Sequence, residues 1–456
     1  MSIVSALFNK SAYSLEDAFK AKDITSPAMR EAIMDWFDLY MAKKPHGDED
    51  PCQQIPGTIV RKISTTAFSE YNASSKDEFV ERALESLDKY KTTALQAALI
   101  GGECLLKPIP EDDAWRWTVI RRNDMLVFGR GDDGGLMDVG TAEYTTNSNG
   151  YYTLLERRTV DERGYLTIRY ALYHSNTSGQ LGVPVSLQSL EQYANLQPEY
   201  TFTKPVGSIG LVPLRTPMEN CVDGGADAVS VYAAAVGLIH NINRNEFQLN
   251  TEFENGESRV FVSADLMSRD SDGRRKFRDH IFVGLDDDAE SVGVTIFSPE
   301  LREQSFLARK TEYLRNVESV IGLKRGLLSE VEAAERTAKE ITSSEGDYNL
   351  TIISFQRAWE SAAKEAVRLC GALGQLYGVA GAHEVNEDDI SFDWGNGVLF
   401  DEDKTWADYL DMVARGMLKP EIAMGWRFGM PTETPGDLQK IREKYMPELE
   451  SMAGEE

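Results

Sequence analysis

The sequence predicts an α+β fold in which a β-rich region is followed by three long helices. Apolar residues recur at helical spacing before residue 100 and again after residue 222. From Trp115 to Val212, apolar and polar residues alternate between glycine-rich turns, which is the pattern of strands. The 456 residues, of which 42% are hydrophobic and 27% charged, are enough for two or more structural regions with a buried core.

Four elements are expected before the β-rich region. Apolar faces at helical spacing predict a helix from Ser14 to Met41. A polar, proline-containing segment separates it from a helical run between Ile59 and Tyr71. A further helix is expected from Ser75 to Ala98, and the segment IGGECLLKPI, residues 100–109, predicts a strand.

Three glycines of the β-rich region match the G-x-G-x-x-G pattern of dinucleotide-binding loops: Gly129, Gly131 and Gly134. In such a loop a helix must begin within the glycines, so that its amides meet the pyrophosphate. The segment that follows here, LMDVGTAEY, has the pattern of a strand instead. We therefore expect a hairpin turn, and the lack of a G-x-x-x-x-G-K-[ST] motif argues against a P-loop nucleotide site.

The first long helix is expected from Ala226 to Glu254, which corresponds to about 40 Å at about 1.5 Å per residue. Its second half is dense in neutral polar side chains that suit either the wall of a water-filled passage or ordinary solvent exposure. They are Asn241, Asn243, Asn245, Gln248, Asn250 and Thr251.

Two further long helices are expected. The second covers residues 298–321, because a serine followed by a proline forms a good helix start. The third begins at residues 329–332, where SEVE matches a capping box, and extends to about residue 377. The segment SSEGD around Gly346 is expected to kink or interrupt it.

A small αβ insertion is expected between the first two long helices, from Ser258 to Val294, with strands at RVFVS, HIFVG and VGVTIF. It contains a basic run and an acidic run, which suit head-to-tail pairing between copies of the chain and equally an intramolecular pairing. The two runs are Arg274, Arg275, Lys276 and Arg278, and Asp286, Asp287, Asp288 and Glu290.

The C-terminal part is expected to begin with a strand and turn in DISFDWGNGVLFDE. Two short helices are expected to follow, in WADYLDMVARGML and PEIAMGWRFG.

Charge and cysteine usage exclude several classes of protein. The chain carries 48 Lys and Arg against 74 Asp and Glu, and its net charge of −26 opposes tight, sequence-reading binding of DNA. The four cysteines lie far apart without a CxxC pair, so we expect reduced thiols and neither a zinc site nor a disulfide framework. No signal peptide and no membrane-spanning stretch is recognisable, so we expect a protein of a cytoplasm-like compartment.

No metal, cofactor or catalytic site is predicted. Asp270-x-Asp272-Gly273 resembles the middle of a calcium loop, but Asp279 stands at the last ligand position in place of a glutamate. His383-Glu384 lacks the second histidine of H-E-x-x-H. An acidic cluster is expected to be a solvated face, with a divalent-ion site as the alternative. It consists of Glu384, Glu387, Asp388, Asp389, Asp393, Asp401, Glu402 and Asp403.

Several segments and their order carry a resemblance to a known family. They are GTIVRKISTTAFSE, ALIGGECLLKPI, LVPLRTPMEN before the first long helix, ERTAKEI near the start of the third, and WADYLDMVARGMLKPEIAMGW near the end. On these segments, and on the order of long helix, insertion, long helix, short loop and long helix, the chain resembles the portal proteins of tailed bacteriophages. The resemblance covers nearly the whole chain.

The resemblance implies a portal-type fold with long stem helices, an αβ clip insertion and a mixed α/β wing, assembled as a ring, usually of twelve subunits. It implies a wing over residues 1–222, a first stem helix over 223–257, a clip over 258–297, a second stem helix over 298–321, a tunnel loop over 322–328, a long wing helix over 329–380, and a wing strand with crown-like helices over 381–456.

The function that the resemblance implies is a non-enzymatic ring at one capsid vertex that conducts double-stranded DNA during packaging and ejection. Lys324 and Arg325 of the tunnel loop would touch DNA phosphates or, alternatively, cap the C-terminal dipole of the second stem helix. The clip charges would serve ring assembly or docking. The implied partners are copies of the chain, terminase large subunit, major capsid or scaffolding protein and a head-tail adaptor, in a virion assembled in the host cytoplasm.

Two alternatives remain open from the sequence alone. One is a metal-dependent enzyme acting on nucleic acid through the C-terminal carboxylates. The other is a different structural protein of the capsid.

Overall fold

The computed structural model describes residues 15–42, 51–111, 114–132, 134–256, 301–329, 338–386, 389–395, 402–432 and 434–446, with four short strands between residues 259 and 297. The chain divides into two compact units. One consists of Met1–Ala67 and Ser74–Ser391, and the other of Phe68–Ala73 and Phe392–Glu456. The observed elements mix helices and strands, in agreement with the predicted α+β class.

Among the described residues, the helices before strand β2 are α2 (Leu15–Phe19), α3 (Pro27–Tyr40), α4 (Ile55–Ala67), α5 (Glu78–Asp88) and α6 (Lys91–Gly101). The single helices predicted over 14–41 and 75–98 are therefore wrong, because each is two helices. The Ser26 hydroxyl accepts from the Met29 amide and Pro27 occupies the first turn, so a new helix begins there. Asp77 caps α5 in the same way, by accepting from the amides of Phe79 and Val80.

Two antiparallel sheets confirm the predicted β-rich region. A three-stranded sheet has the order β10-β2-β3, and a six-stranded sheet has the order β4-β5-β6-β7-β8 with β9 also on β7. The strands are β2 (Glu103–Pro110), β3 (Trp115–Arg121), β4 (Met125–Arg130), β5 (Leu136–Asn147), β6 (Gly150–Val160), β7 (Leu166–Ser175), β8 (Val183–Val185), β9 (Glu199–Thr201) and β10 (Val212–Arg215).

The glycine motif lies in a hairpin turn, as predicted. Strands β4 and β5 pair antiparallel, with Arg130 opposite Leu136. The amide of Gly134 donates to the carbonyl of Gly131 at 2.9 Å, and Gly134 has a φ of 78°, which favours glycine. No helix begins within the glycines, so the amides have no pyrophosphate-binding arrangement.

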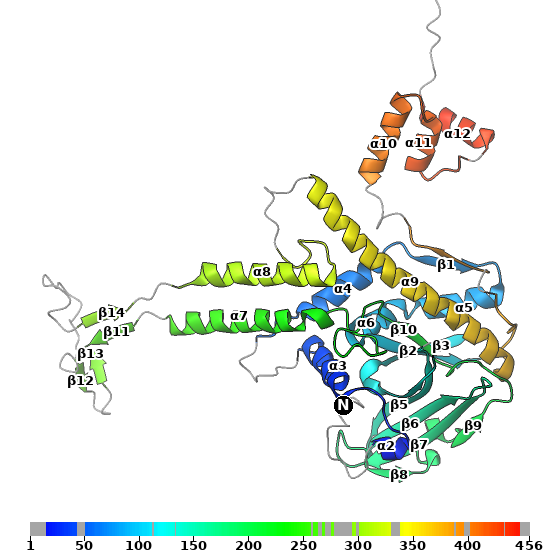
Figure 1. Ribbon diagram of the computed structural model, residues 1–456, viewed down its shortest axis with the longest axis horizontal. Coiled ribbons are helices and arrows are strands. Elements are labelled where there is room, and N and C mark those ends of the chain that lie inside the picture. The colour runs from blue at the N-terminus through cyan, green and yellow to red at the C-terminus, as the bar shows by residue number, and fades with distance from the viewer. Residues whose placement is uncertain are drawn as a thin grey trace, which may run out of the picture. The chain divides into compact units, whose positions relative to one another are not determined.

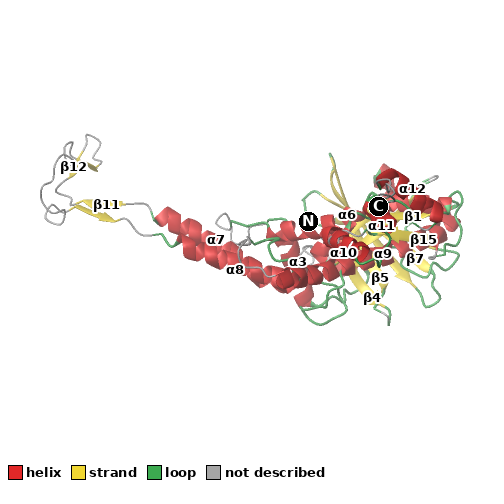
Figure 2. Cartoon of the chain, turned by 90° about the horizontal axis from the view of Figure 1, so that it is seen from above, coloured by secondary structure: helices red, strands yellow, loops and turns green. Residues whose placement is uncertain are grey.

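Three long helices follow the sheets: α7 (Val236–Asn255), α8 (Glu303–Ile321) and α9 (Ala338–Tyr377). Helices α7 and α8 pack side by side in both views of the chain (Figures 1 and 2). The long helix α9 lies against α4 and α5 and against strands β2 and β10, and its Phe355 and Trp359 are buried.

The bounds of these helices correct the sequence prediction. Helix α7 begins at Val236 and not at Ala226, and α8 begins at Glu303 and not at residue 298. Helix α9 runs without interruption through Gly346, because one glycine in a helix interior costs only about 1 kcal/mol. Its first described residue is Ala338, and residues 330–332 of the predicted start lie outside the described residues.

The insertion between α7 and α8 contains β11 (Arg259–Val262), β12 (Met267–Arg269), β13 (Arg275–Phe277) and β14 (Val294–Phe297). Strand β11 pairs antiparallel with β14, and β12 with β13. The strands predicted at RVFVS and VGVTIF are confirmed. The strand predicted at HIFVG lies outside the described residues.

The remaining elements are β1 (Asn72–Ser75), β15 (Ile390–Asp393), α10 (Glu402–Ala414), α11 (Pro420–Arg427) and α12 (Pro435–Tyr445). Strands β1 and β15 form a two-stranded sheet. The predicted strand and two short helices are confirmed. Helix α12 has a capping box, in which Thr434 and Asp437 hydrogen-bond reciprocally, and lies beyond the helices that the sequence predicted.

A buried carboxylate joins the two large sheets. Glu156 of β6 is 4% exposed and forms ion pairs with Lys107 of β2 and with Arg158 of β6. Arg158 also donates to the carbonyl of Gly210 at 2.8 Å. Burial alone would raise the pKa of Glu156, but the two cations lower it to about 2.

We expect this carboxylate to make stability depend on pH. Because its folded pKa lies below the ordinary value of 4.5, its contribution is complete above pH 4.5 and is lost as pH falls toward 2. At pH 7, Glu156→Gln should therefore be less stable by about 3 kcal/mol, and the deficit should shrink as pH falls. Urea unfolding of the full chain at several pH values measures this. Glu199→Gln, in an exposed pair with Arg169, is the control, and equal behaviour of the two variants would contradict the prediction.

Candidate functional site

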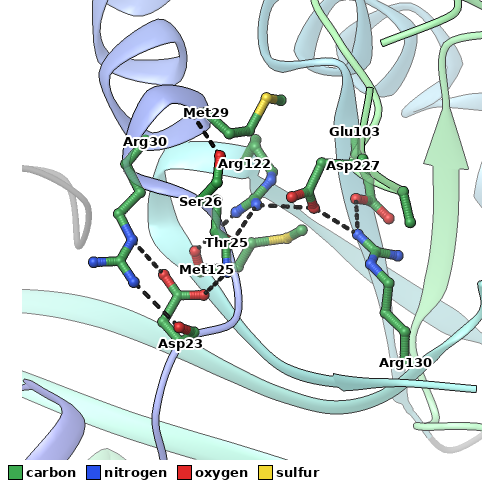
Figure 3. A network of polar contacts seen from close by, with 12 residues as sticks. Asp23, Thr25, Ser26, Met29, Arg30, Glu103, Arg122, Met125, Arg130 and Asp227 are labelled. Atoms are coloured by element: carbon green, nitrogen blue, oxygen red, sulfur yellow. Dashed lines mark hydrogen bonds and ion pairs between the residues drawn. The ribbon is translucent and has the colours of Figure 1, made fainter. Parts of the chain in front are cut away.

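The segment before α7 is fixed to the body of the chain by a charged network (Figure 3). Arg122 and Arg130 both donate to the carboxylate of Asp227, at 3.4 and 2.8 Å. Arg130 also pairs with Glu103, whose side chain is fully buried, at 3.4 Å. A second branch of the network joins Arg122 to the Thr25 hydroxyl at 3.1 Å. The network contains two arginines and two carboxylates, so each buried charge has a partner of opposite sign. A charge buried without such a partner would be costly.

Backbone and hydroxyl contacts continue this attachment up to the start of α7. The Val231 amide and the Ser230 hydroxyl both donate to the Leu99 carbonyl at 3.0 Å. Tyr232 is fully buried and donates its hydroxyl to the Trp36 carbonyl at 2.9 Å. Because residues 228–232 are buried in contact with the body, the regular helix begins only after a short 3-10 turn over Ala233–Ala235.

Polar contacts hold α7 and α8 together. Asn245 donates to the Phe306 carbonyl at 3.0 Å, and Lys310 pairs with Glu246 at 2.8 Å. Farther along, Arg302 binds the carboxylate of Glu252, with one N–O distance of 2.6 Å. These hydrogen bonds to Arg302 lower the pKa of Glu252.

The neutral polar residues in the second half of α7 do not all face water. Asn243 and Asn245 are buried, and Asn243 accepts from the Gln53 amide at 2.9 Å. Asn241, Gln248 and Asn250 are exposed. Two of the predicted amides therefore bind neighbouring elements of the same chain, and only the exposed ones are placed to face water.

The described residues after α8, 322–329, are closely attached to the helix. Gly322 ends α8 in the left-handed conformation, with a φ of 78°. The amides of Gly322 and Leu323 both reach the Glu318 carbonyl. A Cβ atom on Gly322 would lie 2.8 Å from the hydroxyl oxygen of Thr351 in α9, so glycine is also required for the close approach of that helix.

A buried carboxylate organises the rest of this loop. Glu318 has no exposed surface, and one of its oxygens accepts from the amides of Gly326, Leu328 and Ser329 at 3.1, 2.6 and 3.0 Å. The other oxygen accepts from the Ser329 hydroxyl at 2.8 Å. Several hydrogen bonds to one ionised group are the arrangement that makes a buried carboxylate tolerable.

Lys324 and Arg325 stand at the tip of this loop. Lys324 is half-buried and Arg325 is exposed. Burial raises the pKa of Tyr348 in α9, and the charge of Lys324 opposes that rise, so the lysine lies near this ring. Tyr348 in turn donates to the Thr66 hydroxyl at 3.0 Å. The loop thus presents two cations between two fixed points, the end of α8 and the Gly326 amide.

The charges predicted to serve the insertion are placed only in part. Arg275 and Lys276 lie in β13, opposite Arg269 and Ser268. The other members of the two runs lie outside the described residues: Arg274, Arg278, Asp286, Asp287, Asp288 and Glu290. The calcium-like residues Asp270, Asp272, Gly273 and Asp279 also lie outside them.

The acidic cluster near the C-terminus is described only in part, and Glu387, Asp388 and Asp401 lie outside the described residues. Glu384, Asp389 and Asp393 are exposed. Across the described residues, no group of three or more His, Cys, Asp or Glu side chains could hold a metal ion. None of the described helices is both long and apolar enough to span a membrane.

Two of the four cysteines are buried. Burial raises the pKa of the Cys104 and Cys370 thiols, so both are unreactive as nucleophiles. Cys221 is exposed and Cys52 is half-buried.

Sequence reasoning did not single out Glu318, although a signal was present. An acidic residue in the last turn of a helix opposes the helix dipole, which favours cations there. Such a residue directly before a loop with two glycines is therefore a candidate for binding the loop amides.

We expect Glu318→Ala to release the loop while leaving α8 folded. Removing the carboxylate leaves several amides without a partner, which corresponds to about 2 kcal/mol or more of local stability. Hydrogen exchange at Gly326, Leu328 and Ser329 should then speed up about 30-fold. Glu312→Ala, at an exposed position of α8, is the control. Equal exchange in both variants would show that the carboxylate does not hold the loop.

Comparison with known proteins places the chain in a family. The family model described as phage portal protein, SPP1 Gp6-like, matches residues 69–444. No curated protein matches the chain.

Two solved structures are similar at low identity. One is a chain of the neck of a native GTA particle, computed with C12 symmetry, with 11% identity and a TM-score of 0.47. The other is a chain of the neck of an empty GTA particle, computed with C6 symmetry, with 12% identity and a TM-score of 0.47. In each comparison 94% of this chain and 99% of the other chain are covered.

The family model spans most of the sequence, including the three-stranded and six-stranded sheets, the long helices and residues 322–329 after α8. The chain belongs to the SPP1 Gp6-like family of phage portal proteins.

Proposed function

We propose that copies of this chain form a ring at one vertex of a phage capsid, and that the ring conducts double-stranded DNA during packaging and ejection. The observation that carries the proposal is membership of the portal family, which is a family of structural proteins of the phage head. Conduction, the number of copies and the partners are parts of the proposal.

The elements suggest how the regions of such a ring are divided. We assign residues 1–222 and helix α9 to a wing, α7 and α8 to a stem, and the strands β11 to β14 to a clip. The loop over residues 322–328 is the proposed tunnel loop, and α10 to α12 form the proposed crown-like part. The polar contacts between α7 and α8 support the stem assignment, because they make the two helices one stiff rod.

The loop suits weak contact with DNA. Lys324 and Arg325 are two cations in a chain of net charge −26, so they would be attracted to phosphates while most of the protein repels them. Few phosphate contacts give weak, salt-sensitive binding, which allows a polymer to move past. The Glu318 contacts hold the backbone of the loop, so the two side chains would meet DNA from a defined position.

The clip is the proposed docking surface for a terminase large subunit and later for a head-tail adaptor, and the wing for major capsid or scaffolding protein. The residues proposed for pairing between clips or for docking are Arg274, Arg275, Lys276, Arg278, Asp286, Asp287 and Asp288. ATP hydrolysis would come from the terminase, because the chain has no P-loop motif. The protein would be assembled in the host cytoplasm and remain in the virion.

Electron microscopy of the purified full-length protein tests the ring. We expect closed rings with a central channel, with twelve copies as the expected number. A monomer that persists at high concentration would contradict the proposal. Closed lattices without isolated rings would indicate a shell protein instead.

We expect the double variant Lys324→Glu with Arg325→Glu to assemble normal rings and to lower DNA packaging at least about tenfold, since two attractions to phosphate become repulsions. The number of DNA-filled particles measures the effect. The double variant Arg163→Glu with Lys204→Glu changes the charge equally at exposed positions of two other loops and is the control. Equal packaging by the two double variants would remove the loop cations from the mechanism.

A further inference from the structure

Helix α10 carries an apolar stripe that is exposed on the chain. Ala407, Leu410, Ala414 and Met417, just after the helix end, recur at intervals of three and four residues, which places them along one side. All four are exposed, Leu410 by 48% and Met417 by 75%. Exposed apolar residues in a continuous stripe, unlike scattered ones, mark a surface that binds another.

The stripe is not the face by which α10 packs on its own neighbour. That face contains Trp406, Tyr409 and Val413, which are all half-buried. The Tyr409 ring lies 5.1 Å from the ring of Trp426 in α11. Helix α10 thus has two apolar sides, and its contact with α11 covers one of them.

The unit formed by α10, α11 and α12 has a very small core. Among the described residues from 406 to 446, those buried are Glu421, Ala423, Gly425 and Ile441. The other apolar contacts in these three helices come from half-buried side chains, so part of their apolar surface stays open to a further contact.

The edges of this three-helix unit differ in the charged side chains that they expose. Helix α11 contacts both α10 and α12, so α10 and α12 form the edges. The stripe on α10 is flanked by the exposed acids Asp408 and Asp411, of which Asp411 pairs with Arg415 at 2.8 Å. The edge at α12 exposes Lys440, Lys444 and Glu443, together with Arg442, which pairs with Glu421 of α11 at 2.8 Å. It also presents an apolar contact, because Phe428, which is 50% exposed, stacks on Tyr445 at 4.4 Å.

We propose that the α10 edge of one copy packs against the α12 edge of the next copy, so that the crown-like unit is completed by its neighbour. The stripe would cover the Phe428–Tyr445 stack, and the acids beside it would face the lysines of α12. Two different edges that fit each other make a head-to-tail contact, and such contacts close into rings. The inference rests on the proposed ring and names the surfaces that meet in it.

Hydrogen exchange in assembled rings tests the proposal. We expect Leu410→Asp to keep the rings intact and to speed exchange of the α10 amides at least about tenfold, because the covered stripe would receive a charge. Met412→Asp is the matched control, since Met412 is 43% exposed on another side of the same helix. If the α10 edge faces water in the ring, both substitutions will behave alike and the proposal fails. Protection of α10 that is equally strong in the dissociated wild-type chain would also overturn it, because the cover would then belong to the same copy.

Cross-linking identifies the partner surface. In rings mixed from normal and ¹⁵N-labelled chains, a zero-length carbodiimide should join Asp408 or Asp411 of one copy to Lys440 or Lys444 of another. Links only within one copy would contradict the head-to-tail contact. Wild-type protein that forms no rings would overturn the proposed function together with this inference, whereas rings without these links would overturn the inference alone.

Discussion

The attachment of helix α7 to the body of the chain depends on one buried ionic contact, the binding of Asp227 by Arg122 and Arg130. The carboxylate lies nine residues before α7, and the two arginines come from the body of the chain. Removing Asp227 would leave the buried guanidinium of Arg122 without that carboxylate, which is more costly than the pair itself is stabilising. The contacts of Ser230 and Tyr232 then carry the attachment to the base of the helix. This attachment at the base of α7 orients the α7–α8 pair and the loop that follows α8.

The class of fold and most elements could be predicted from the sequence, because periodicity and turn residues are local signals. The alternation in the β-rich region and the hairpin glycines were sufficient for the sheets. Helix starts were less well predicted. The proline after Ser26 and the acid at Asp77 were signals that a longer apolar pattern concealed. The start of α7 had no local signal, since an alanine-rich segment favours helix and only tertiary contacts hold it in another conformation.

The candidate site, too, could be predicted only where the signal is local in the sequence. Lys324 and Arg325 were singled out because the family resemblance implies a loop near DNA at residues 322–328. The residue that fixes that loop, Glu318, belongs to the helix and acts through amides eight to eleven residues away. Backbone amides leave no trace in side-chain patterns, so only the dipole argument pointed to it. The buried state of Asn243 and Asn245 was also hidden, because an amide side chain suits a wet surface and a helix contact equally well.

The attachment of the loop at both ends has a geometric consequence. Between the Leu323 amide and the Gly326 amide, each bonded to Glu318, only Lys324 and Arg325 remain, so the backbone cannot swing outward without breaking these bonds. The position of the two cations is therefore set by this stretch of backbone. In a ring of such subunits, the width of the opening at this height would follow from the spacing of the α8 helices. The width of the opening would therefore change only when whole helices move, and not through motion of the loop alone.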